Sequence, residues 1–343
     1  MTEAEAVRTV AIVIPFYQRT PGILARALDS VLTQDLPPGI RVIVHIVDDA
    51  SPLPAESELA SLEPVPGITT CVTHQVNSGP GGARNRGLDL AESDGADFVA
   101  FLDSDDIWLP RHLRDAMTAL DQGYDFYCCD NSREGAFELF SQDVPLLSDG
   151  GRALAARATW LADGPVLGFP AHALDDEFVT GYLSHTSTVV LRGSRLNGLR
   201  FDPELRSASE DRMFWLSYVV SGAPVVISWR CNVVCGKGVN IFFAANDWNA
   251  PATLERIGCQ LLFALKLLRM PGMTPVRTEF AVDRARTKRR AYSFLFLRTL
   301  LRGHRPPTAS FGRLLRHDPL LPLWMPALFL SVFVDRRPGA RQF

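Results

Sequence analysis

Short apolar runs alternate with longer amphipathic stretches over the first 130 residues. Buried strands are predicted at VAIVIPF (10–16), RVIVHIVDDASP (41–52), TTCVTHQ (69–75) and DFVAFL (97–102). Helices are predicted at GILARALDSVLTQ, directly after the first strand, and within NSGPGGARNRGLDLAE (77–92). This alternation indicates an α/β fold with a doubly wound, Rossmann-like sheet.

The pattern continues less regularly to residue 222. The expected elements are a helix over 107–125 capped by Asp105 or Asp106, a strand at 124–131, loops with a short helix over 132–183, a strand at 185–191 and an amphipathic helix within 201–222. The loosely patterned stretch is expected to border a cleft.

The motif FLDSDD (101–106) places Asp103, Asp105 and Asp106 directly after a predicted strand. In open α/β sheets, ligands bind at the carboxyl ends of the strands. Clustered carboxylates repel one another, and a hard divalent cation such as Mg²⁺ or Mn²⁺ relieves the repulsion. The alternative is a polar turn whose Asp caps the next helix.

A glycine-rich turn precedes the second helix, at Gly79, Gly81, Gly82 and Gly87. This spacing does not fit G-x-G-x-x-G, and the turn follows the third strand instead of the first, which excludes an NAD site. We expect the turn to lie across a nucleotide diphosphate, with Arg84 donating to phosphate. The alternative is an ordinary loop with a surface arginine.

Several other polar residues allow both a chemical and a structural interpretation. Glu210 and Asp211 precede a helix, where acids also complement the positive helix terminus. Cys231 and Cys235 form C-x3-C without a second pair, so packing is favoured over zinc. His185 is interpreted as structural. Lys237 lies between two glycines, where it could close over phosphate or simply be solvated.

Composition and charge bear on location and partners. The N-terminus has acids where a secretory signal has basic residues, and six scattered cysteines fit a reducing compartment, so we expect the chain in the cytoplasm. From residue 271 onward there are 14 Arg and Lys against 4 Asp and Glu, a local charge of +10, which leaves −13 for residues 1–270. A basic end suggests an anionic partner. No nucleic-acid fold signature accompanies it, so nucleic acid is not expected.

The C-terminal part combines these charges with apolar stretches. Residues 253–270 predict an apolar-faced helix, 284–305 mix arginines with AYSFLFL, and PLLPLWMPALFLSVFV (319–334) has 16 uncharged residues with three prolines. That run is short for a membrane span. Contact with an anionic membrane surface, at the inner face of the cell membrane, and packing on the preceding α/β part of the chain are both open interpretations.

Five motifs together resemble one family. In order they are VIPFYQR, HIVDDAS, NSGPGGARNRG, FLDSDD and SASED. The chain is similar over residues 8–235 to family 2 glycosyltransferases with a GT-A fold. IPFYQRTPGILARALDSVLTQ and CGKGVNIFF are most similar to the glucosyltransferases of succinoglycan and related bacterial exopolysaccharides. The resemblance implies a GT-A catalytic domain at 1–250 and a helical, basic extension at 251–343.

The resemblance also implies roles for residues on the donor side. Pro15 and Tyr17 would line the base of the nucleotide, and Asp49 would accept a hydrogen bond from the uracil ring. Arg84 would lie near the base or the diphosphate. The donor would be a UDP-sugar, expected to be UDP-glucose.

The remaining implied residues concern metal and catalysis. Asp103 would reach the ribose or the metal, Asp105 would ligate Mg²⁺ or Mn²⁺, and Asp211 would be the base that deprotonates the acceptor hydroxyl. The expected reaction is inverting transfer to a saccharide, expected to be lipid-linked. The segment RMFWLSY after Asp211 departs from many relatives, which leaves acceptor contacts open. A nucleotidyltransferase acting on a sugar phosphate and an inactive GT-A binding module are the alternatives.

Overall fold

The computed structural model describes residues 7–60, 62–150, 152–161, 164–236 and 250–334. The chain forms two compact units, the first comprising Met1–Phe201 with Phe214–Val239 and the second Asp202–Met213 with Asn240–Phe343. Lys237 and most of CGKGVNIFF lie outside the described residues. The functional division at residue 250 stays a prediction.

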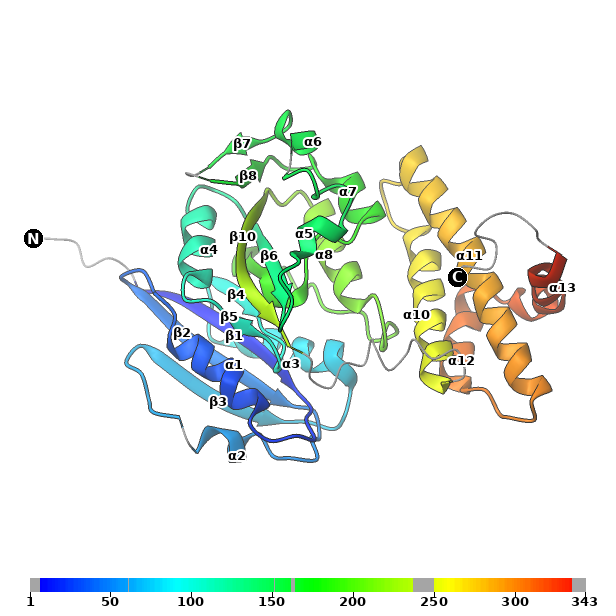
Figure 1. The fold of residues 1–343 in the computed structure, drawn as a ribbon, viewed down its shortest axis with the longest axis horizontal. Coiled ribbons are helices and arrows are strands. Elements are labelled where there is room, and N and C mark those ends of the chain that lie inside the picture. The colour runs from blue at the N-terminus through cyan, green and yellow to red at the C-terminus, as the bar shows by residue number, and fades with distance from the viewer. Residues whose placement is uncertain (1–6, 61, 151, 162–163, 237–249, 335–343) are drawn as a thin grey trace, which may run out of the picture. The chain divides into compact units, whose positions relative to one another are not determined.

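The first unit is built on a ten-stranded mixed sheet (Figure 1). In spatial order its strands are β3 (Ile68–His74), β2 (Ile40–Asp48), β1 (Arg8–Phe16), β4 (Phe98–Phe101), β9 (Val189–Arg192), β6 (Phe126–Arg133), β10 (Val225–Cys235), β8 (Val166–Phe169) and β7 (Thr159–Trp160), and β5 (Ile107–Trp108) pairs with β10. Strands β1 to β4 pair in parallel, whereas β9 is antiparallel to both of its neighbours. The predicted α/β fold of GT-A type is confirmed.

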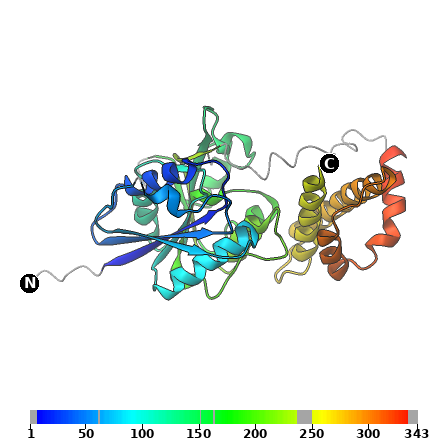
Figure 2. The same ribbon diagram turned by 90° about the horizontal axis from the view of Figure 1, so that it is seen from below.

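Helices cover the sheet. They are α1 (Ile23–Leu32), α2 (Glu56–Leu59), α3 (Gly79–Ser93), α4 (His112–Leu120), α5 (Phe140–Asp143), α6 (Arg152–Ala155), α7 (Asp175–Thr180) and, from residue 214 onward, α8 (Glu210–Val220), whose first residues belong to the second unit. Short 3-10 turns, η1 (Thr186–Thr188) and η2 (Gly193–Arg195), flank β9. Figure 2 shows α1 and α3 on opposite sides of the strands.

Close packing of α3 on β1 explains one glycine of the glycine-rich turn. A Cβ at Gly87 would lie 2.2 Å from Val13 Cγ1, so only glycine allows this approach. Val13 itself is fully buried, as are the residues on both sides of it in β1. The buried strands therefore hold the helix that presents Arg84.

Three expectations for the middle of the first unit were wrong. The helix expected over 107–125 starts at His112, because Ile107 and Trp108 pair with β10 instead. Neither Asp105 nor Asp106 caps that helix, since its N-cap is Arg111. The stretch 132–183 contains β7 and β8 besides short helices. Both strands are short, and β8 contains a glycine, so they have little periodic signal.

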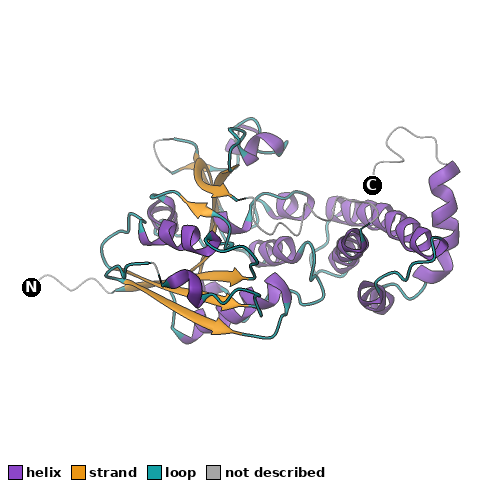
Figure 3. Cartoon of the chain, turned by 60° about the horizontal axis from the view of Figure 1, so that its bottom comes forward, coloured by secondary structure: helices purple, strands orange, loops and turns teal. Residues whose placement is uncertain are grey.

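From residue 250 onward, the regular structure of the described part of the second unit is helical (Figure 3). Its helices are α10 (Pro251–Leu267), α11 (Pro275–Leu301), α12 (Thr308–His317) and α13 (Leu321–Val334). Helix α10 packs on α11 and α12, and α13 packs on α11. Among the described residues, no single helix is long and apolar enough to cross a membrane. By length and composition alone, Ala309–His317 and Leu321–Val334 would suffice together, although the two helices meet at a bend of 108°.

Candidate active site

The acidic turn lies between β4 and β5, at the carboxyl edge of the parallel strands. The backbone N–H of Asp103 donates to Ser187 Oγ at 3.0 Å, and the Ser187 hydroxyl donates to Asp106 Oδ2 at 2.5 Å. The indole N–H of Trp108 donates to the Ser187 carbonyl at 2.7 Å. Ser187, in η1, therefore fixes both ends of the turn.

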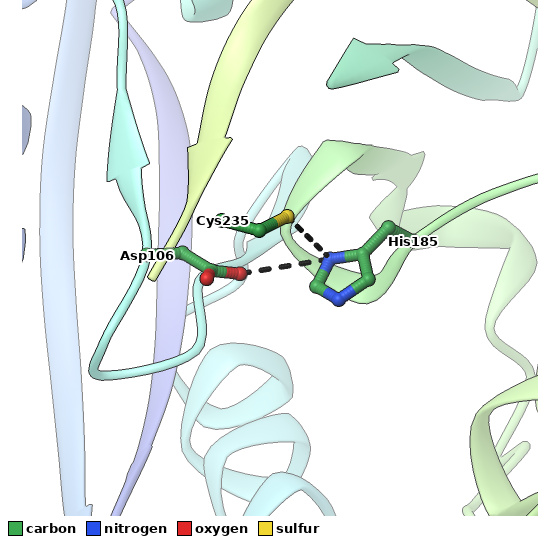
Figure 4. A group of neighbouring side chains, drawn as sticks. All are labelled: Asp106, His185 and Cys235. Atoms are coloured by element: carbon green, nitrogen blue, oxygen red, sulfur yellow. Dashed lines mark hydrogen bonds and ion pairs between the residues drawn. The ribbon is translucent and has the colours of Figure 1, made fainter. Parts of the chain in front are cut away.

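Asp106 is an internal anchor of this turn. Its second carboxylate oxygen accepts the Gly236 N–H at 2.9 Å, which ties the turn to the end of β10. Figure 4 shows its side chain pointing toward His185 and Cys235, with 3.6 Å from His185 Nδ1 to Asp106 Oδ2 and 3.6 Å from His185 Nδ1 to Cys235 Sγ. Sequence reasoning missed this role of Asp106, because its partners come from segments about 80 and 130 residues away.

Asp103 forms an ion pair with Arg84. The Arg84 guanidinium donates to Asp103 Oδ1 at 2.7 Å, and the Arg84 residue is only 4% exposed. Burial favours a raised pKa for Asp103, but Arg84 and then His185 outweigh it, so the pKa lies below its usual value. The interpretation of Arg84 as a surface arginine is therefore wrong, and the structure brings Arg84 and Asp103 together.

Asp105 differs from its two neighbours. Within the described chain, its carboxylate makes no side-chain hydrogen bond or ion pair. Burial, followed by the charges of Asp106 and Asp103, raises its pKa to about 7. Burial and the neighbouring carboxylates thus disfavour the ionised form of Asp105. A bound divalent cation would stabilise that form, and carboxylate oxygen is the ligand that such a cation prefers. The residues present thus fit the predicted Mg²⁺ or Mn²⁺.

Asp49 is buried at the end of β2 and joins this strand to α3. Its Oδ1 accepts from Gln75 Nε2 and the Ser78 N–H, both at 2.7 Å, and its Oδ2 accepts the Gly79 N–H at 2.9 Å. A carboxylate has about four lone-pair sites, so one further donor, as predicted for uracil, is compatible with these bonds. The role of Asp49 toward a base stays a prediction.

Pro15 and Tyr17 lie at the end of β1, and both are partly buried. Because β1 pairs in parallel with β2 and β4, these residues lie at the same sheet edge as Asp49 and the acidic turn. The neighbouring Gln18, which sequence reasoning missed, donates to Ser104 Oγ of the acidic turn at 3.0 Å. The end of β1 is thus bonded directly to the candidate metal site.

Asp211 lies in the first turn of α8, and its Oδ1 accepts the backbone N–H of Arg212 at 2.7 Å. It belongs to the second unit, so a shared cleft with Asp105 stays a prediction. Farther along the same helix, Phe214 and Trp215 pack against Phe101, the last residue of β4, with ring centroids 6.2 and 5.2 Å apart.

Comparisons with known proteins agree with this geometry. The profile of Glycosyl transferase family 2 matches residues 11–144. The chain is 35% identical over 261 residues to the succinoglycan biosynthesis protein ExoW of Rhizobium meliloti (strain 1021), covering 72% of this chain and 78% of that protein. It is 29% identical over 196 residues to the amylovoran biosynthesis glycosyltransferase AmsB of Erwinia amylovora, covering 56% and 58% of the two chains.

Solved structures share the fold at low sequence identity. S. aureus TarS 1–349 in complex with UDP-GlcNAc gives a TM-score of 0.58 at 17% identity, covering 94% of this chain and 88% of that one. The mannosyltransferase PcManGT from Pyrobaculum calidifontis, in complex with GDP-Man and Mn²⁺, gives 0.53 at 17% identity, covering 96% and 87%. These likenesses concern the fold, whereas the match to ExoW is extensive and close enough to assign the family. The chain belongs to glycosyl transferase family 2.

Proposed function

We propose that this protein transfers a sugar from a UDP-sugar, expected to be UDP-glucose, to a lipid-linked saccharide with inversion, in bacterial exopolysaccharide synthesis. The observation that supports this most is the buried acidic turn at the sheet edge, in which Asp105 forms no ion pair within the described chain and has a pKa raised to about 7. The names of the relatives, which refer to succinoglycan and amylovoran biosynthesis, support the exopolysaccharide setting.

Asp105 would hold the divalent cation, with Asp103 beside it. When bound, the cation would stabilise the negative charge that develops on the leaving diphosphate. Arg84, held by Asp103, would keep a positive charge near the phosphates. Pro15, Tyr17 and Asp49 would hold the base.

Asp211 would be the general base for the acceptor hydroxyl, which is a poor nucleophile unless its proton is removed. A single displacement at the anomeric carbon inverts its configuration, so an α-linked donor would give a β-linked product. Asp211 has no other role in this proposal, and donor binding should not depend on it.

The test is a screen of purified protein with nucleotide sugars and Mn²⁺, in which the released nucleoside diphosphate is measured. Asp105→Asn should abolish Mn²⁺-dependent donor binding, and Asp211→Asn should retain it while transfer falls by roughly 100-fold or more. Asp35→Asn, an exposed acid of the first unit, is the matched control. Pyrophosphate as the product would indicate a nucleotidyltransferase, and no turnover with any donor would favour a binding module.

We also propose that α13 contacts the surface of an anionic membrane. Leu323 is 74% exposed and Phe333 62% exposed, and Arg298 lies over the ring of Phe294, which stacks on Phe329 of α13. Exposed apolar side chains beside arginines suit a phospholipid surface. Leu323→Gln with Phe333→Gln should reduce sedimentation with phosphatidylglycerol vesicles, and unchanged sedimentation would contradict the contact.

A further inference from the structure

Four basic side chains of the second unit lie on neighbouring helices, and we refer to them as the basic cluster: Arg212, Arg256, Arg284 and Lys288. Arg284 and Lys288 are one turn apart on α11, and both are partly buried. The guanidinium groups of Arg284 and Arg212 lie 5.9 and 5.3 Å from the centre of the same ring, that of Phe280. Arg256, on α10, is near enough to Lys288 for its charge to act on it, so three helices direct positive charge to one region.

Several acids of this unit pair with cations outside the basic cluster. Those pairs are Asp202 and Glu204 with Lys266, Glu204 with Arg316 and His317, Glu255 with Arg313, and Asp318 with Arg289. Glu279 and Asp283 line a separate hollow on α11 together with Arg286. Within the described chain, neither Arg284 nor Lys288 forms an ion pair.

The electrostatic consequence is clear at Lys288. Burial, followed by the charges of Arg284 and Arg256, lowers its pKa to about 8. Burial also lowers the pKa of Arg284 and of Arg256. For Arg284 and Lys288, which form no ion pair within the described chain, burial without a counter-charge is unfavourable, and acids within a fold usually remove this cost. Here an anion from outside the chain would do so.

We propose that the basic cluster binds the phosphate or diphosphate group of a lipid-linked acceptor, an inference that rests on the proposed transferase function. The planar forks of arginine match phosphate oxygens, and the lysine adds a point charge. Arg212 directly follows Asp211, the residue proposed to deprotonate the acceptor, and Arg212 belongs to the cluster. The basic cluster would therefore bind the anionic group of the acceptor next to Asp211, the residue proposed to deprotonate the acceptor hydroxyl.

The test measures binding of inorganic pyrophosphate and of geranyl diphosphate to the full chain by calorimetry, without divalent metal. The double variant Arg284→Gln with Lys288→Gln should bind both at least 10-fold more weakly than the wild type. The control double variant, Arg286→Gln with Arg305→Gln, changes two exposed residues by the same total charge and should differ by less than twofold. Equal binding by the two double variants, or no binding by the wild type at low millimolar concentration, would overturn the proposal.

Thermal unfolding shows whether the variant is folded and gives a second readout. Removing mutually repelling charges should leave the melting temperature of the ligand-free variant equal to or above that of the wild type. Pyrophosphate should raise the melting temperature of the wild type and not that of the variant, because only a ligand of the folded state stabilises it. If the double variant does not fold, Lys288→Met is used in its place, because methionine keeps most of the aliphatic side chain. A rise in melting temperature with pyrophosphate as large as that of the wild type would then refute the site.

Two further measurements separate the sources of phosphate and the two proposals. Sedimentation with phosphatidylglycerol vesicles should be unchanged in the double variant Arg284→Gln with Lys288→Gln. If the variant instead loses vesicle binding by the same factor as diphosphate binding, the basic cluster binds membrane headgroups and the proposal is wrong. Hydrolysis of the UDP-sugar should also be unchanged, because the cluster contacts the acceptor. If the wild type hydrolyses no nucleotide sugar, the proposed function fails, while the binding measurements still decide the anion site.

Discussion

Gly236→Ala tests how the end of β10 supports the acidic turn. A Cβ at this position would lie 1.9 Å from the carbonyl oxygen of Asp105 and 2.9 Å from its carbonyl carbon. Both are backbone atoms, so no side chain can rotate away. The backbone N–H of the same glycine donates to Asp106 Oδ1, and separating the two segments would break this bond.

The expected effect follows from these contacts. Forcing one extra carbon into a packed site costs about 1–3 kcal/mol. A hydrogen bond to a charged group contributes roughly 1.5–3 kcal/mol, part of which is lost as well. We therefore expect the free energy of unfolding to fall by at least about 2 kcal/mol. A displacement of about 1 Å at Asp105 should reduce turnover by roughly 100-fold.

The measurements are chemical denaturation, Mn²⁺ affinity and hydrolysis of the UDP-sugar. Gly312→Ala is the matched control, since Gly312 lies in α12 with nothing within 4 Å of the added carbon. It should be neutral or stabilise the protein by about 0.5–1 kcal/mol, because alanine favours helix. A Gly236→Ala protein with wild-type stability and Mn²⁺ affinity would show that β10 does not support the metal site.

Other perturbations test the surroundings of the site. His112 is fully buried, which lowers its pKa to about 3, so only the unfolded state takes up a proton between pH 6.5 and 3. Between pH 7 and pH 5, the free energy of unfolding should fall by about 2 kcal/mol more in the wild type than in His112→Phe. Denaturation curves that show the same fall in both proteins would contradict this. Gly87→Ala should destabilise the protein by about 1–3 kcal/mol through its clash with Val13, and an unchanged melting temperature would refute that packing. Asp106→Asn should weaken Mn²⁺ binding at least 10-fold by disturbing the bonds from Ser187 and Gly236; unchanged affinity would show that these bonds do not position the turn.

The strands that are buried on both faces were predictable, because their apolar runs leave little ambiguity. β1, β2 and β4 lie within two residues of the expected positions, apart from the acidic end of the second run, which leaves the sheet after Asp48. β5, β7 and β8 were not predictable, since strands of two to four residues have no measurable period. Their pairing depends on partners far along the chain.

The acidic turn shows the same limit at the level of single residues. Three carboxylates within four positions indicated a cation, but their separate environments depend on contacts that no local pattern records. Arg84 compensates Asp103, and Ser187 and Gly236 donate to Asp106, whereas Asp105 forms no ion pair and no hydrogen bond to another side chain within the described chain.

This division explains how the turn can be both rigid and able to bind a cation. If all three carboxylates were compensated, little negative potential would be left for a divalent ion. If none were, mutual repulsion would favour protonation or a displaced turn. With the outer two acids held by an arginine, a serine hydroxyl and a backbone amide, the middle acid is fixed in place by its neighbours while its own charge is still unpaired. The structure therefore leaves the carboxylate that the proposed ion would contact without an ion-pair partner within the described chain, while the acids on either side of it are held in place.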